Sequence, residues 1–171
     1  MTLPDWDADS GLLPPGRHLT TFEGLYERFV QDAPHREHRE RLFSAFRLHS
    51  KLVAEYLPGG GALWVDGGFA MRKAAAPHDV DVAIVPADWT DVDNWTDQQY
   101  VDILGLLTLQ SVIVWQPGPS ALERIQPVGA LLDAFLVPES KKDNWHLTWS
   151  AVKVDGEIIE GQVKGYAEVA I

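Results

Sequence analysis

Two aspartates separated by a single residue open an apolar segment near the middle of the chain. Asp79 and Asp81 flank Val80, and the apolar run 82–85 follows directly. Residues two apart in a β-strand lie on the same face. The spacing therefore predicts that both carboxylates point one way and the alternating valines point into the core. Neighbouring carboxylates repel each other unless a cation neutralises them. Because carboxylate oxygens suit Mg²⁺ or Mn²⁺, we expect a metal site here; a solvated strand edge or turn is the alternative.

A third aspartate interrupts another apolar segment. Asp133 lies within residues 131–137, whose composition is otherwise that of a buried strand. An aspartate there must be paired, hydrogen-bonded or bound to metal, because burying an isolated carboxylate is very costly. The alternative is a position at the solvated end of the strand. Together with the Asp-x-Asp pair, Asp133 is the third candidate metal ligand and catalytic residue.

A pair of glycines precedes the Asp-x-Asp pair. Gly67 and Gly68 follow a predicted strand and open a short helical stretch, where the backbone can approach a phosphate closely. Arg72 and Lys73 come shortly afterwards and are candidates for neutralising that phosphate. The alternatives are a simple turn for the glycines and a solvated helix face for the two cations. We expect these four residues to bind nucleotide.

The elements that must position these residues follow from hydrophobic spacing and from helix and turn signals. Helices are predicted over 21–30, with Thr20 and Glu23 as its capping pair, and over 34–57, 69–74 and 96–107, and a helical turn at Ser120 with Glu123. Strands are predicted over 62–65, 80–85, 111–115 and 131–137, and a hairpin at Asp155-Gly156. We expect one α/β (α+β) domain over 1–171: a twisted mixed β-sheet core (about 62–137), flanking helices, an N-terminal helical segment (20–57) and the C-terminal hairpin.

Composition narrows the classes of function. The 171 residues carry 25 Asp plus Glu against 14 Lys plus Arg, a formal net charge of -11. A protein that binds nucleic acid by charge alone needs an excess of basic residues over acidic ones. The absence of cysteine excludes disulfides and thiolate catalysis. The start of the chain has no signal-peptide pattern, and no apolar run approaches the ~20 residues of a membrane helix. We therefore expect a cytoplasmic protein that does not enter the membrane.

The motifs together resemble the DNA polymerase beta-like nucleotidyltransferase superfamily. Members place Gly-Gly or Gly-Ser at a helix start, Asp-x-Asp or Asp-x-Glu on the next strand, and a third acidic residue on a later strand. The whole chain is also similar to a group of small bacterial nucleotidyltransferase-like proteins. That similarity rests on Leu13-Pro14-Pro15-Gly16-x-His18, Pro77-x-Asp79-x-Asp81 and Lys164-Gly165.

The resemblance implies a transferase that uses Mg²⁺ (or Mn²⁺) and a nucleoside triphosphate such as ATP. It would move a nucleoside monophosphate to an RNA, protein or small-molecule acceptor. Asp79 and Asp81 would hold the ion that grips the triphosphate, Asp133 would share a second ion and help to activate the acceptor hydroxyl, and Lys164 is a weaker phosphate candidate. Many such bacterial proteins belong to toxin–antitoxin or phage-defence systems, so the resemblance also implies a cognate protein partner.

Two other functions remain open at this stage. A non-catalytic relative with the same fold would serve as a binding or regulatory protein. An antibiotic-type small-molecule nucleotidyltransferase would present an acidic cleft to a cationic substrate, which the net charge permits. The acidic balance also favours a protein or small-molecule acceptor over tRNA.

Overall fold

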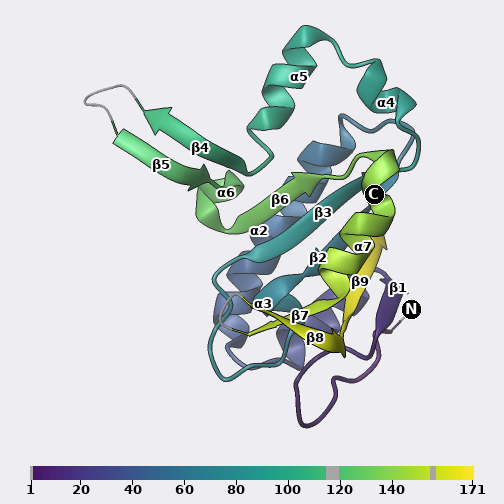
Figure 1. Cartoon of the computed structure of the whole chain (residues 1–171), viewed down its shortest axis with the longest axis vertical. Coiled ribbons are helices and arrows are strands. Elements are labelled where there is room, and N and C mark those ends of the chain that lie inside the picture. Colours follow the sequence, from purple (N-terminus) through teal and green to yellow (C-terminus); the bar gives the residue numbers. More distant parts are fainter. Residues whose placement is uncertain (1, 115–119, 155–156) are drawn as a thin grey trace.

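A five-stranded mixed sheet forms the centre of the computed structural model, which describes residues 2–114, 120–154 and 157–171. Its strands lie in the order β1 (Gly16–Thr20), β9 (Gly165–Ala170), β2 (Gly61–Asp66), β3 (Val80–Pro86) and β6 (Leu132–Leu136) (Figure 1). β2 runs antiparallel to both β9 and β3, whereas β6 runs parallel to β3 and β1 parallel to β9. The expected mixed sheet with flanking helices is confirmed.

Each face of the sheet packs against helices because strand residues alternate between the two faces. On one face, Leu63 and Val65 of β2 join a large core that includes Leu42 and Phe46 of α2 (Arg36–Ala54). On the other face, Trp64 joins a smaller aromatic core that includes residues of α7 (Lys142–Ser150). Figure 1 shows α2 behind the sheet and α7 in front of it. The face towards α7 is the one that carries the polar residues described below.

The N-terminal helices differ slightly from their predicted bounds. The first consists of α1 (Phe22–Tyr26) and the π-helical turn η1 (Glu27–Gln31). Its N-cap is Thr21, whose hydroxyl accepts a hydrogen bond from Gly24 N at 3.2 Å, so the predicted Thr20 cap is off by one residue. Pro34 precedes α2 rather than opening it, because His35 has a left-handed backbone with a φ of 63°.

Residues between β3 and β6 form a protruding arm. After α4 (Thr90–Asp93), α5 (Asp97–Leu104) begins at the predicted Thr96–Gln99 capping box. The antiparallel hairpin of β4 (Leu109–Val114) and β5 (Ser120–Ile125) then projects from the body, and the short α6 (Pro127–Ala130) leads back to β6 (Figure 1). The helical turn predicted at Ser120 and Glu123 is wrong, since both residues lie in β5. A capping signal stabilises only locally, whereas pairing with β4 supplies a full ladder. Trp115, the predicted end of the third strand, lies outside the described residues.

The C-terminal part of the chain completes the sheet. The turn η2 (Glu139–Lys141) leads into α7, and the short α3 (Gly67–Ala70) follows β2. Strands β7 (Ala151–Val154) and β8 (Glu157–Val163) pair as the predicted hairpin, whose turn Asp155-Gly156 lies outside the described residues. Strands β1 and β9 and helix α7 were not predicted. No helix in the described ranges is long and apolar enough to cross a membrane.

Candidate active site

Three aspartates lie side by side across three neighbouring strands. Asp66 of β2 pairs with Asp81 of β3, and Asp81 pairs with Asp133 of β6. Neighbouring strands are separated by about 4.8 Å, and all three residues share the sheet face that packs on α7. Asp79 precedes β3 and lies two residues before Asp81. The structure thus brings the three predicted aspartates together and adds a fourth, Asp66.

Asp81 lies in an electrostatically unfavourable position at the centre of this row. Burial raises its pKa to about 7, and the neighbouring charges of Asp79, Asp66 and Asp133 push in the same direction, opposed by Lys164. In the described part of the chain, no hydrogen bond or close ion pair of the Asp81 carboxylate is found to offset this repulsion. A carboxylate in this position has a strong physical reason to bind a cation.

Gly67 makes room for Asp81. It has a φ of +70°, and a Cβ atom at this position would overlap the Oδ2 atom of Asp81. Only glycine combines that backbone conformation with so close an approach. At Gly68, by contrast, an added Cβ would lie 3.4 Å from the nearest side-chain atom, Cβ of Pro77, which is an ordinary contact. Gly67 therefore packs directly against the central aspartate, whereas Gly68 packs against Pro77.

Asp66 forms a buried ion pair with Lys164. The Nζ atom of Lys164 donates to both carboxylate oxygens and to the carbonyl of Trp149 at 2.8 Å. Burial pushes the pKa of Asp66 upward, while Lys164 and the backbone N–H of Gly67 oppose this effect. With only 4% of Lys164 exposed, each partner depends on the other, because an unpaired buried charge is strongly destabilising.

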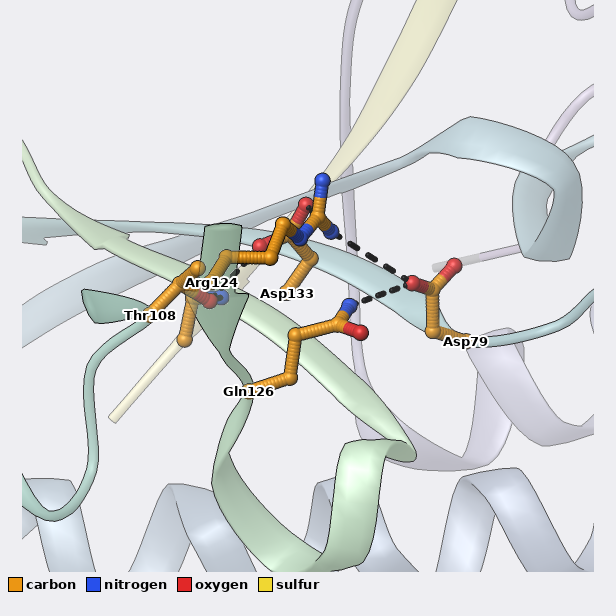
Figure 2. A network of polar contacts seen from close by, with 6 residues as sticks. Asp79, Thr108, Arg124, Gln126 and Asp133 are labelled. Atoms are coloured by element: carbon orange, nitrogen blue, oxygen red, sulfur yellow. Dashed lines mark hydrogen bonds and ion pairs between the residues drawn. The ribbon is translucent and has the colours of Figure 1, made fainter. Parts of the chain in front are cut away.

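Asp133 and Asp79 are held by residues at the base of the arm (Figure 2). Arg124 of β5 donates from Nη2 to Asp133 Oδ2, and the same nitrogen lies 3.9 Å from Asp79 Oδ2. Thr108 donates to Asp133 Oδ1 at 2.6 Å, and Gln126 Nε2 donates to Asp79 Oδ2 at 2.7 Å. Arg124 thus lies between two carboxylates as a shared cation.

A cavity of about 260 Å³ opens next to Asp66 and Asp81. Gly67, Gly68 and three lysines contribute to its lining. The full set is Asp66, Gly67, Gly68, Met71, Lys73, Asp81, Thr148, Trp149, Ala151, Lys153 and Lys164. Its walls therefore combine two carboxylates with three cations, a composition suited to an anionic ligand that carries a metal ion.

The predicted phosphate-binding cations are separated by the structure. Lys73 lines the cavity next to Asp81, whereas Arg72 lines only a second cavity of about 470 Å³, which Lys73 also borders. That second cavity is formed largely by the N-terminal segment 5–11, and the backbone N–H of Arg72 donates to Gly11 O there at 2.9 Å. Lys73 therefore lies beside the predicted aspartate site, whereas Arg72 lies in the other cavity.

Sequence reasoning missed several of these residues. Asp66 carried a usable signal, because it ends a strand immediately before the Gly-Gly pair. Arg124 and Gln126 carried none, since only a helical turn was expected at Ser120 with Glu123, just before them. Lys153 was assigned only to the C-terminal hairpin. Lys164 was recognised as a phosphate candidate, but the structure shows it paired with Asp66.

Across residues 2–114, 120–154 and 157–171, no group of three or more acidic or histidine side chains is arranged to hold a metal ion as it stands. Two of the aspartates are engaged by Lys164 and Arg124 instead. A metal ion would therefore have to displace or share an existing cationic partner.

The fold and the site together define a mixed α/β protein with a row of aspartates beside a lysine-lined cavity. The chain belongs to a family of unknown function, DUF6932, whose model matches residues 4–170. No curated protein and no solved structure matches the chain.

Proposed function

We propose that the protein is a metal-dependent nucleotidyltransferase, which moves a nucleoside monophosphate from a nucleoside triphosphate to an acceptor hydroxyl and releases pyrophosphate. The observation that carries this proposal is the pairing of Asp81 with Asp133 on adjacent parallel strands, beside a cavity lined by Gly67, Gly68 and lysines. The order of these elements along the chain supports the resemblance to the polymerase beta-like superfamily. Its core would comprise β2, α3, β3 and β6.

The donor residues fit a divalent cation. Asp81 has a pKa of about 7 because burial and three neighbouring carboxylates disfavour its charged form, and a cation bound there relieves that repulsion. Asp79, Asp81 and Asp133 would hold Mg²⁺ or Mn²⁺, which would neutralise charge on the triphosphate when bound. Asp133 would help to activate the acceptor hydroxyl by accepting its proton.

The cavity would hold the phosphates of the nucleotide. Its volume of about 260 Å³ lies just below the usual range of about 300–1,000 Å³ for small-molecule pockets. That size suits a triphosphate better than a complete nucleotide. Lys73 and Lys153 would pair with phosphate oxygens, whereas Lys164 would hold Asp66 in place. The base and ribose would then lie outside this cavity.

The acceptor would be a protein, an RNA or a small molecule. The net charge of -11 favours a protein or a cationic small molecule, because RNA would be repelled by most of the surface. A cytoplasmic toxin–antitoxin or phage-defence role, with a cognate partner, is the context that the resemblance supports.

A non-catalytic binding protein is the second candidate, and one observation favours it. Lys164 and Arg124 already partner Asp66 and Asp133, so these two carboxylates have cationic partners without a metal ion. A protein of this kind would bind nucleotide in the presence of Mn²⁺ without turning it over.

Incubation with each nucleoside triphosphate, labelled in the α-phosphate, tests the proposal directly. With Mg²⁺ and cell lysate, the wild-type protein should label one acceptor, and Asp81→Asn should label none. Nucleotide binding without any labelled product would favour the second candidate. Absence of both binding and label would contradict both functions.

A further inference from the structure

Arg124 reaches the aspartate row from an element that is otherwise separate from the main sheet. It lies on β5, which among the described residues pairs with β4 alone, in a hairpin of its own. At the base of this arm, Thr108 N donates to Ala134 O at 2.8 Å, and the remaining described contacts with the row are those of Thr108, Arg124 and Gln126. These are the polar contacts of the arm with the aspartate row, whereas its apolar residues Trp95, Leu106 and Val128 pack against the main core.

The position of Arg124 is that of a cation shared by two carboxylates. Its Nη2 atom bonds to Asp133 Oδ2 and lies 3.9 Å from Asp79 Oδ2. Those two residues are the ones proposed to hold the metal ion with Asp81. Because a guanidinium and a divalent ion cannot both occupy the space between the same two carboxylates, the two cations compete for this position.

The exposure of the partners makes Arg124 displaceable. Its side chain is 44% exposed, whereas that of Asp133 is 8% exposed. An ion pair with one well-solvated partner contributes little net stability, so a divalent ion can replace the guanidinium at small cost. The Lys164–Asp66 pair differs in this respect, because Lys164 is buried.

We propose that Arg124 is an internal cation that occupies the Asp79–Asp133 position until a metal ion displaces it, after which it binds a phosphate of the incoming nucleotide. This inference rests on the proposed function. A planar guanidinium forms paired hydrogen bonds with phosphate as readily as with carboxylate. Arg124 thereby couples the two binding events: it weakens the binding of the metal ion and strengthens the binding of the nucleotide.

The test measures Mn²⁺ binding and nucleotide binding separately in wild type and in Arg124→Ala. Loss of the free-ion paramagnetic resonance signal reports Mn²⁺ alone. Calorimetry with saturating Mg²⁺ and a triphosphate whose α–β bridge cannot be cleaved reports the nucleotide. Arg124→Ala should bind Mn²⁺ about fivefold more tightly, as expected for removal of a partly exposed competing charge, and should bind the nucleotide several-fold more weakly.

Two control variants separate charge from shape. Arg124→Lys keeps the positive charge and should bind Mn²⁺ as wild type does. Gln110→Ala changes an exposed residue opposite Arg124 on β4 and should leave Mn²⁺ affinity within about twofold of wild type. Thermal unfolding shows whether each variant is folded.

The outcomes are distinct. If Arg124→Ala strengthens or weakens the binding of both ligands, or changes neither, the coupling is refuted while metal-dependent nucleotide binding stands. If neither wild type nor variant binds Mn²⁺, both this inference and the proposed function are overturned.

Discussion

Replacing Asp81 with asparagine removes the charge at the centre of the aspartate row and keeps the shape of the side chain. In the folded protein the pKa of Asp81 rises from its ordinary value of 3.8 to about 7. The folded state therefore binds this proton more tightly than the unfolded state does. The resulting destabilisation is absent below pH 4, grows as the pH rises between 4 and 7, and is fully present above pH 7.

The size of the effect follows from this difference. At 1.36 kcal/mol for each unit of pKa, the change from 3.8 to about 7 sets an upper bound of about 4 kcal/mol. Asp81 borders the cavity and is partly solvated, so solvent screening reduces this value. We expect Asp81→Asn to raise the free energy of unfolding above pH 7 by about 1–2 kcal/mol. For a chain of this length, that gain raises the Tm by roughly 2–8 °C.

Thermal unfolding in chelator at pH 8 and pH 4.5 measures the gain. Asp81→Asn should be more stable than wild type at pH 8, and the difference should shrink at pH 4.5. Asp93→Asn, a change at an exposed aspartate, should match wild type within ~0.5 kcal/mol. Added Mg²⁺ and nucleotide should then stabilise wild type more than Asp81→Asn. An Asp81→Asn variant less stable than wild type at pH 8 would refute the reasoning about repulsion.

Other substitutions test the remaining parts of the site. Gly67→Ala should destabilise the fold by about 2–4 kcal/mol in urea unfolding, because it combines positive φ with a steric overlap, whereas Gly68→Ser should be tolerated and should preserve nucleotide binding. Gly68→Val should block nucleotide binding without unfolding the protein, as calorimetry would show. Lys164→Met should cost about 3–5 kcal/mol by leaving a buried carboxylate unpaired, and unchanged stability would contradict the ion pair. Lys73→Ala should weaken triphosphate binding several-fold, whereas Arg72→Ala, which changes a different cavity, should leave it unchanged.

Local patterns were sufficient for much of the sheet. The alternation around Asp81 and the apolar run around Asp133 each predicted a strand, and both strands are present as β3 and β6. The Thr96–Gln99 box predicted the start of α5. These signals work because the spacing of apolar residues and the chemistry of a helix cap are set by a few consecutive residues.

The parts that were not predicted depend on contacts between distant residues. Lys164 and Asp66 are 98 positions apart, and nothing near either residue indicates the other. Arg124 reaches Asp133 only because its segment pairs with β4, and the Ser120–Glu123 spacing pointed to a helix instead. Strand register is set by the packing of the whole sheet. Asp66 ends a strand immediately before the Gly-Gly pair, but its place beside Asp81 in the row is set by the pairing of β2 with β3.

The position of a bound metal ion tests the central claim most directly. Crystals grown with Mn²⁺ and a triphosphate with an uncleavable α–β bridge would locate the ion by its anomalous scattering. The proposed function predicts a peak coordinated by Asp79, Asp81 and Asp133, with phosphate oxygens completing the ligands beside Lys73. A nucleotide bound in the second cavity near Arg72, or the absence of any peak at the aspartate row while nucleotide is present, would contradict it.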